Sequence, residues 1–147
     1  MATVEGIHLH GPRDEPMRSV SEATLEAERG IVGDRYFGLG IDGTHITFIS
    51  AEGVEAMVSE TGIPLAPIDT RRNLLTRGVD LDSLIGRRFR VGEAVCFGVK
   101  HCAPCNHLES VTRPGVREGL SGRGGLRADV VSGGTVRVGD GIELLPE

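Results

Sequence analysis

Residues 71–109 read RRNLLTRGVDLDSLIGRRFRVGEAVCFGVKHCAPCNHLE and give the clearest evidence for the fold of this chain. Its first apolar run, at 71–76, predicts a strand. Residues 87–91 and 94–99 predict two more strands, and the Gly-Glu pair between them is a hairpin signal. The centre of the chain therefore has the pattern of short strands joined by tight turns.

The same pattern continues toward both ends of the chain, where many of the 22 glycines separate short Val/Ile/Leu runs. Further strands are predicted at 3–10, 45–49, 126–131, 135–138 and 141–145. One clear helix is predicted to begin after Ser50, a good N-cap residue, and to end near Gly62. A second, shorter helix is predicted over 103–110. We therefore predict a mainly β, barrel-like fold with one or two short helices, forming a single domain over residues 1–147.

Composition excludes several classes of protein. No apolar run approaches the roughly 20 residues that a membrane-spanning helix needs, so we expect no membrane association. The N-terminus lacks a basic start followed by an apolar region, and the cysteine count of three is odd. Both features predict a cytoplasmic protein with reduced thiols. The five aromatic residues are too few for a surface that stacks single-stranded nucleic acid, so no nucleic-acid partner is expected.

Charge is distributed unevenly along the chain. Residues 1–70 hold 4 Arg against 12 acidic residues, whereas 71–90 hold 6 Arg against 2 Asp. Arginine suits two-pronged binding of phosphate or carboxylate, so this cluster predicts a small-anion site, with a solvated surface as the alternative. Because Arg71 and Arg72 are neighbours on a predicted strand, we expect at most one of them to line a given cleft.

The sharpest local chemistry is the run KHCAPCNH at 100–107. Cys102 and Cys105, with His101 and His107, have the ligand types of a zinc site, and their spacing also suits a dithiol redox pair. Simple packing of the thiols is a third interpretation. The fourth is a single reactive thiolate that ligates a soft metal or carries sulfur. Cys102 ends a strand just ahead of the predicted helix, which predicts that it is more reactive than Cys105.

Taken together, these residues resemble a known family. The stretch 71–109 is similar to the signature of the MOSC family, the molybdenum cofactor sulfurase C-terminal domain. GIVGDRYFGLG with THITFISAE resembles the family's glycine-aspartate loop and following strand and helix. GLSGRGGLRADVVSGGTVRVGDGIEL resembles its closing strands. The resemblance covers roughly residues 1–145.

The resemblance implies a cleft that holds the pterin-based molybdenum cofactor. Cys102 matches the family's cysteine that ligates molybdenum or is proposed to carry sulfur. Arg71 and Asn73 match the arginine–asparagine pair of the preceding strand, and Arg35 lies in the matching glycine-aspartate-arginine loop. These residues, together with Cys105, are the expected cofactor site.

The resemblance leaves the reaction open. The domain that binds pyridoxal phosphate in the eukaryotic sulfurases has no counterpart here, and nothing marks Lys100 as a Schiff-base residue, so no pyridoxal phosphate site is expected. The implied activities are sulfur transfer to the molybdenum centre and reduction of N-hydroxylated compounds, with a sulfur-donor or electron-donor protein as partner. A non-enzymatic cofactor or sulfur carrier, and a zinc or dithiol redox protein using the CxxC pair, are the alternatives.

Five positions also carry weaker signals. His8 and His10 share a strand face, where solvent exposure is favoured over a metal pair. His45 begins a strand and is expected to be structural. From the residues alone, Asp34 and Arg35 belong either to a simple turn or to a cofactor contact.

Overall fold

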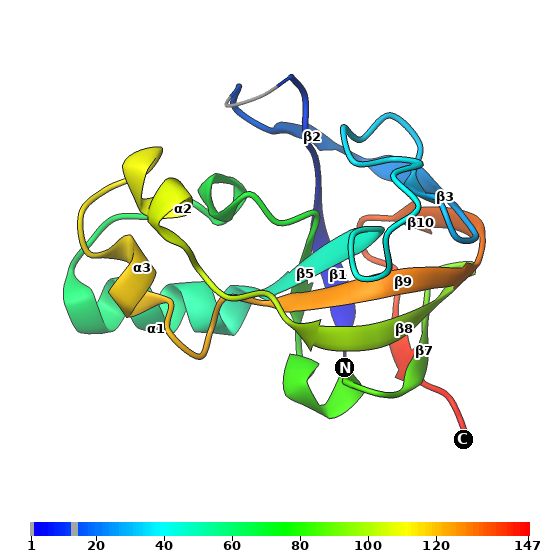
Figure 1. The fold of residues 1–147 in the computed structure, drawn as a ribbon. Helices are drawn as coiled ribbons and strands as arrows, with labels where there is room; N and C mark the ends of the chain where they lie inside the picture. The colour runs from blue at the N-terminus through cyan, green and yellow to red at the C-terminus, as the bar shows by residue number, and fades with distance from the viewer. Residues whose placement is uncertain (1, 13–14) are drawn as a thin grey trace.

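The computed structural model describes residues 2–12 and 15–147, and it is built mainly of strands (Figure 1). Eight strands form one sheet in the order β11-β7-β8-β9-β5-β6-β1-β2, and three form a second sheet in the order β10-β3-β4. The strands are β1 (Thr3–Leu9), β2 (Arg18–Val20), β3 (Glu22–Glu26), β4 (Gly30–Ile31), β5 (Ile46–Ser50), β6 (Leu74–Arg77), β7 (Arg88–Val91), β8 (Ala94–His101), β9 (Leu126–Ser132), β10 (Gly134–Arg137) and β11 (Ile142–Leu144). The mainly β prediction is confirmed.

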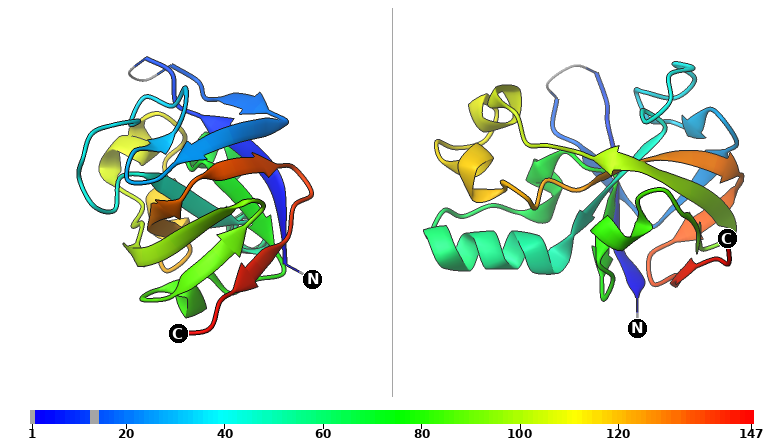
Figure 2. Two further views of the ribbon diagram at one scale, coloured as in Figure 1. Left: turned by 90° about the vertical axis from the view of Figure 1, so that its right-hand side faces the viewer. Right: turned by 60° about the horizontal axis from the view of Figure 1, so that its bottom comes forward.

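The helices gather at one side of the sheet, away from both chain ends (Figure 2). They are α1 (Ala51–Thr61), α2 (Asn106–Ser110) and α3 (Val116–Gly119). Two 3-10 turns, η1 (Pro67–Thr70) and η2 (Leu81–Leu84), lie in the connections before and after β6. The described residues thus hold three α-helices, where one or two were expected. None of them is long and apolar enough to cross a membrane.

The ends of α1 follow from local sequence, as predicted. The side chain of Ser50 accepts a hydrogen bond from the backbone N–H of Gly53 at 3.1 Å. At the other end Gly62 adopts φ 73°, a left-handed conformation that glycine enters without steric cost. α1 and η1 together form the crossover between β5 and β6, which pair in parallel and therefore need a long connection.

The larger sheet is not closed into a barrel. Its outer strands are β11 and β2. One isolated bridge, between Thr3 and Gly141, and a backbone hydrogen bond of 2.9 Å from Val4 N to the carbonyl of Asp140 join β1 to the turn before β11. The two ends of the sheet thus come together without forming a continuous ladder.

Two of the three buried apolar clusters among the described residues bear on the position of the site. The main core lies between the strands, where the rings of Phe48 and Phe89 meet edge-on with centroids 5.4 Å apart. Such an aromatic pair adds about 0.5–1.5 kcal/mol beyond its burial. A second cluster packs Met57 of α1 against Leu108 of α2 and Val116 of α3. This cluster fixes the helices, and hence the segment between β8 and α2, against the sheet.

Two predicted boundaries shift, and both shifts affect the site. The strand predicted at 71–76 begins only at Leu74, because Arg71 ends η1 in a left-handed conformation with φ 62°. The helix predicted at 103–110 begins only at Asn106. Because the residue before a proline is driven to extended backbone, Pro104 keeps Ala103 out of the helix. Cys102 therefore does not sit at a helix N-terminus.

Candidate functional site

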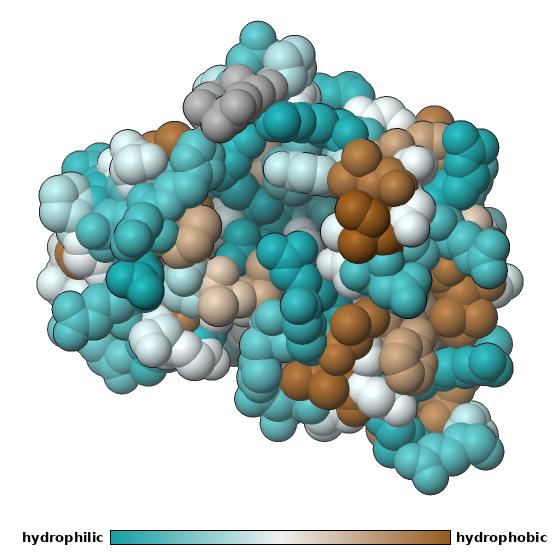
Figure 3. All heavy atoms as spheres, viewed as in Figure 1, coloured by the Kyte–Doolittle hydropathy of each residue, from teal (hydrophilic) through white to brown (hydrophobic). Residues whose placement is uncertain are grey.

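A cavity of about 250 Å³ lies where the ends of several strands meet the loop after β4 and the start of α2. Its volume is just below the range of roughly 300–1,000 Å³ typical of small-molecule sites. In the space-filling view the face is hollowed between the helices and the strands, and most residues around the hollow are hydrophilic (Figure 3). The lining residues are His10, Tyr36, Leu39, Thr44, Thr47, Arg71, Arg72, Asn73, Cys102, Cys105, His107, Leu108 and Arg127.

The cavity is strongly biased toward positive charge. Arg71, Arg72 and Arg127 line it, and none of its lining residues is acidic. Within residues 2–12 and 15–147, none of these three arginines forms an ion pair with a carboxylate. An anion entering the cavity would therefore meet guanidinium groups that no carboxylate of the described residues neutralises.

Arg72 is the most buried of the three arginines, with 9% of its surface exposed. Its guanidinium donates only to backbone carbonyls: Nε to Gly124 at 2.8 Å, Nη1 to Thr70 at 3.2 Å, and Nη2 to Cys102 and Ala103 at 3.3 Å each. Burial lowers the pKa of this guanidinium, Cys102 raises it, and Arg127 lowers it further. Arg72 thus ties the cysteine segment to the segment before β9 through a buried positive charge.

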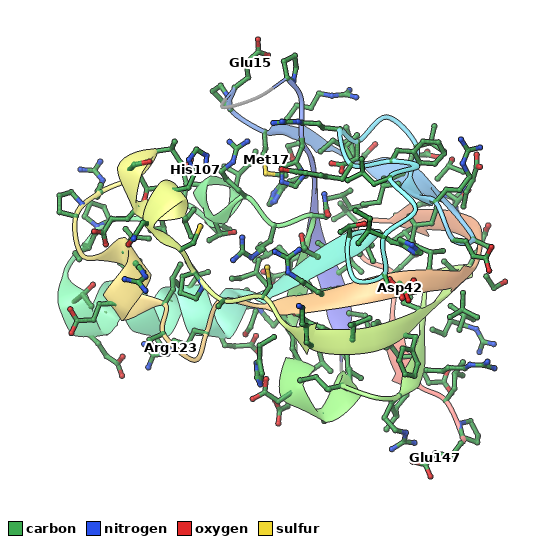
Figure 4. The ribbon with its side chains drawn as sticks, viewed as in Figure 1. Glu15, Met17, Asp42, His107, Arg123 and Glu147 are labelled. Carbon is green, nitrogen blue, oxygen red and sulfur yellow. The ribbon has the colours of Figure 1, made fainter. Side chains whose placement is uncertain are left out.

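Arg71 holds an unusual backbone conformation. Its φ of 62° is sparsely populated by residues other than glycine, asparagine and aspartate. Its carbonyl oxygen lies 2.9 Å from Nε2 of His10, and its Nη1 donates to the carbonyl of Glu15 at 2.9 Å. Glu15 is labelled at the top of Figure 4, and His107 of α2 lies below it. The side chain of Arg71 therefore lies at the rim of the cavity, where its second terminal nitrogen, Nη2, has no hydrogen bond within the described residues.

Asn73 is buried and joins β5, β1 and the loop after β4. Its Oδ1 accepts hydrogen bonds from the backbone N–H of Thr47 at 3.0 Å and from the Thr47 hydroxyl at 3.1 Å. Its Nδ2 donates to the carbonyl of His8 at 3.0 Å and to Oδ1 of Asp34 at 3.1 Å. The hydrogen-bonding capacity of the amide is therefore used by the protein, and its contribution to the cavity is shape and the fixing of its neighbours.

Asp34 does not line the cavity but contacts His10 and Asn73, which do, and 6% of its surface is exposed. Its Oδ1 accepts from the backbone N–H of His10 at 2.7 Å and lies 2.9 Å from Nδ1 of the same residue, while Oδ2 accepts from the backbone N–H of Tyr36 at 3.2 Å. Burial raises the pKa of this carboxyl, but the hydrogen bonds from His10 and Tyr36 outweigh it and hold the pKa below its ordinary value. Asp34 is thus a buried carboxylate whose donors all come from the walls of the site.

The three cysteines differ sharply in environment. Cys96 is fully buried in β8, where burial raises the pKa of its thiol to about 12. Cys102, directly after β8, is 2% exposed, and its backbone N–H donates to the carbonyl of Gly125 at 2.8 Å. Cys105 is exposed. Cys102 and Cys105 line the same cavity, so they are the thiols that a ligand there would meet.

Only a residue without a side chain fits at Gly124. A Cβ there would collide with the carbonyl oxygen of Cys102 and with the ring of Pro104. This close approach lets Arg72 reach carbonyls on both segments at once. The segment that carries Cys102 is therefore contacted closely by Gly124 and by the buried side chain of Arg72.

A larger and more open hollow, of about 750 Å³, lies on the other side of residues 102–104. Its lining includes Glu109 and Glu118 as well as Arg117 and His101, so its charge is mixed. The smaller cavity is the better candidate for a specific anionic ligand, because only there is the positive charge unopposed.

A model of the MOSC domain family matches residues 8–143, almost the whole chain. The chain belongs to the MOSC domain family. A comparison with curated proteins finds no match.

Solved structures support the same fold for this MOSC chain. The YuaD protein from Bacillus subtilis superposes with a TM-score of 0.84 at 22% identity, covering 98% of this chain and 96% of that one. YiiM from Geobacillus stearothermophilus gives 0.81 at 15% identity, with 99% and 76% covered. YiiM from Escherichia coli gives 0.73 at 21% identity, with 99% and 70% covered. At these sequence identities the structural similarity shows the fold alone.

Four of the five predicted site residues of the MOSC chain line one cavity: Arg71, Asn73, Cys102 and Cys105. Arg35 does not line it. Its side chain is exposed, and its guanidinium carbon lies 5.5 Å from the centre of the Tyr36 ring. The loop that was expected to contribute an arginine instead contributes Tyr36 and Leu39 to the lining and Asp34 to the layer beneath.

The expectation that only one of Arg71 and Arg72 lines the cleft is wrong. Strand alternation does not apply to them, because Arg71 ends η1 and both residues precede β6. Sequence reasoning also missed Arg127, which is on β9 next to buried Leu126 and Ala128. The alternating pattern of that strand was the available signal, since it places Arg127 on the face opposite the main core.

The histidines at 8 and 10 were expected to be exposed, and this is wrong. They are 6% and 7% exposed. Burial lowers the pKa of His8, and the hydrogen bond with the carbonyl of Arg72 raises it in part. Both rings pack beside the segment that precedes β6, which gives their nitrogens backbone and carboxylate oxygens as partners.

Of the four residues considered for a zinc site, Cys102, Cys105 and His107 line the cavity, but no three of the four bring their ligand atoms within 4.8 Å of one another. His101 points to Asp82, with 3.2 Å between Nδ1 and Oδ1, and lines the larger hollow. Among the described residues, the one grouping of three metal-type ligands is Asp42, His45 and Asp129. Asp42 lies beside β9, across the view from His107 (Figure 4). His45 Nδ1 there accepts a hydrogen bond from Val130 at 3.0 Å, the structural role expected for it.

Proposed function

We propose that this MOSC chain binds the molybdenum cofactor in the arginine-lined cavity. The observation that carries the proposal is the juxtaposition, in one cavity without acidic residues, of three arginines and two cysteines. The cofactor combines a phosphate with a metal that is bound through sulfur, so it needs both kinds of group. The association of the MOSC family with this cofactor supports the same conclusion.

The residues present fit such a ligand. Arg71 at the rim and Arg127 on β9 would hold the phosphate by charge-assisted hydrogen bonds, each worth about 1.5–3 kcal/mol. Arg72 would act mainly through its positive potential, since its guanidinium already donates four hydrogen bonds to carbonyls. The hydroxyls of Thr44 and Thr47 also line the cavity, but they donate to the carbonyl of Ile41 and to Oδ1 of Asn73, so the donors for a ligand are the arginines.

Cys102 is the proposed ligand to molybdenum or carrier of sulfur. The bonds that fix its carbonyl to Arg72 and its N–H to Gly125 hold its backbone from both sides. Thiolate is a soft ligand and a good nucleophile, which suits either role. The bound cofactor would supply the redox chemistry, and the protein would supply orientation, charge and a cavity that limits access of water.

We propose two classes of reaction: sulfur transfer to the molybdenum centre, and reduction of N-hydroxylated compounds at that centre. Each needs a partner protein that donates sulfur or electrons. A carrier that delivers the cofactor or sulfur to another protein is the non-enzymatic alternative. Reductase activity with an added electron donor would separate the enzyme from the carrier.

A dithiol redox pair is the second candidate function. The observation that favours it is that Cys102 and Cys105 line the same cavity. A redox pair would form a disulfide on mild oxidation and would lose its activity equally when either cysteine is replaced. A molybdenum ligand would depend on Cys102 much more than on Cys105.

The deciding experiment is metal and pterin analysis of the protein purified from a host that makes the cofactor. The proposal predicts molybdenum and pterin in comparable amounts, approaching one of each per chain. Protein that carries neither, or that carries zinc in their place, would contradict it.

A further inference from the structure

Two of the proposed cofactor residues, Arg71 and Asn73, are both linked to the buried carboxylate of Asp34. Oδ1 of Asp34 accepts a hydrogen bond from the side chain of Asn73 at 3.1 Å and lies 2.9 Å from Nδ1 of His10. The other ring nitrogen of His10, Nε2, lies 2.9 Å from the carbonyl oxygen of Arg71. A continuous chain of contacts thus runs from Asp34 to both Asn73 and Arg71.

The contact between His10 and Arg71 has a specific consequence. The left-handed backbone of Arg71 is a strained conformation that persists only where its surroundings hold it in place. Its carbonyl is held by His10, and its own N–H donates to the carbonyl of Ile68 at 3.2 Å. That backbone sets the direction in which the Arg71 side chain leaves the chain, and so its place at the cavity rim.

Asp34 is not explained as a residue of a simple turn. It is 6% exposed, and its donors come from residues 10, 36 and 73, two of which are far away in sequence. Tyr36, bonded to Asp34 through its backbone, also covers His10, with ring centroids 4.9 Å apart and planes at 87°. The loop therefore brings a carboxylate beneath His10 and an aromatic ring against its side.

We infer that Asp34 and His10 are positioning residues of this cavity: they hold Arg71, which binds the anionic end of the ligand, and Asn73, which shapes the cavity wall. This inference deepens the proposed function and rests on it. Neither residue needs to touch the ligand for this role, because each acts through the backbone or side chain of a residue that does.

Two substitutions at position 10 separate the two contacts of the ring. The amide nitrogen of glutamine lies near the place of Nε2 of histidine, so His10→Gln keeps a donor for the carbonyl of Arg71. The amide nitrogen of asparagine lies near the place of Nδ1, so His10→Asn keeps a donor for Asp34 and leaves the Arg71 carbonyl without one. The positioning role predicts that His10→Gln binds the ligand more tightly than His10→Asn.

Stability is expected to rank the same two variants in the opposite order. His10→Gln removes the ring nitrogen that lies beside a buried carboxylate, whereas His10→Asn removes the one that lies beside a neutral carbonyl at a part-buried site, which costs less. A purely structural role would make ligand binding follow stability. The two rankings therefore distinguish positioning from support of the fold.

The experiment measures binding of inorganic phosphate and uptake of molybdenum cofactor released from a donor enzyme, with urea unfolding in parallel. We expect His10→Asn and Asp34→Asn to weaken phosphate binding at least about tenfold, roughly the weight of one charge-assisted hydrogen bond. His10→Gln should stay within about threefold of the wild type. The matched controls are His45→Gln and Asp129→Asn, a buried histidine and a half-buried aspartate that lie outside the cavity. They should leave phosphate binding unchanged.

Each outcome has a defined meaning. Equal binding by the two position-10 variants, or binding that follows their stabilities, would overturn the inference. A wild type that binds phosphate but takes up no cofactor would contradict the proposed function, and the inference would then be judged on phosphate. A wild type that binds neither would contradict both.

Discussion

Nη2 of Arg72 lies 3.3 Å from the carbonyl oxygen of Cys102, across 30 positions of sequence. The same guanidinium reaches Gly124 at 2.8 Å, so one buried side chain fixes both segments of the wall that carries the cysteine. No carboxylate pairs with Arg72 in the part of the chain that the structure describes. The position of the thiol and the positive charge of the cavity therefore depend on the same residue.

Arg72→Lys should destabilise the protein even without a ligand. A lysine ammonium keeps the charge but cannot reach four carbonyls in a plane, so buried acceptors lose their donors at about 1–3 kcal/mol in total. Urea unfolding measures the loss. Arg88→Lys, at an exposed position of β7, is the control and should change the free energy of unfolding by less than about 0.5 kcal/mol. Equal effects at the two positions would show that Arg72 does not have this role.

Arg71→Ala should weaken retention of the cofactor much more than Arg88→Ala. Arg71 lines the cavity, whereas Arg88 is exposed on the outer face of β7. A lost charge-assisted contact of about 1.5–3 kcal/mol corresponds to a loss of roughly 10- to 100-fold in affinity. Dialysis of loaded protein followed by pterin analysis measures retention. Similar losses in both variants would argue against a specific phosphate site.

Limiting iodoacetamide should label Cys105 before Cys102 in the cofactor-free protein. The sequence predicted the opposite order, from a helix expected to begin just after Cys102. In the structure Cys105 is exposed and Cys102 is 2% exposed, so access favours Cys105. Cys96 should not react, because burial raises the pKa of its thiol to about 12. Peptide mapping gives the order, and early labelling of Cys102 would show that its surroundings are more open than described.

The stabilising effect of Asp34 should depend on pH. Its pKa is lowered in the folded protein, so the contribution is complete above the unfolded value of about 3.9 and is lost as pH falls through the folded value. The difference in unfolding free energy between the wild type and Asp34→Asn should therefore be constant near neutral pH and shrink below about pH 4. A difference that grows on acidification would have the wrong sign for a carboxylate stabilised by its donors.

Features that depend on neighbouring residues could be predicted from the sequence, whereas contacts between distant segments could not. Ser50 and Gly62 bound α1 as predicted, because capping depends on a few neighbouring residues. The left-handed backbone of Arg71 could not be predicted, because it depends on His10, 61 positions away. Asp34 was left between two interpretations for the same reason, since its partner Asn73 lies 39 positions away. The family resemblance identified Arg71, Asn73 and Cys102 as residues of the cavity, and the structure added Arg72 and Arg127.

The most direct test of the account compares Cys102→Ser with the wild type, both purified from a host that makes the cofactor. The account predicts that the cofactor-free forms melt at nearly the same temperature. It also predicts that Cys102→Ser loses nearly all bound molybdenum or persulfide, because a hydroxyl is harder and much less readily ionised than a thiol. Pterin analysis of the same samples shows whether the arginines still hold the rest of the cofactor. A Cys102→Ser protein that melts much earlier, beside a wild type that holds neither molybdenum nor sulfane sulfur, would contradict the account and make Cys102 a structural residue.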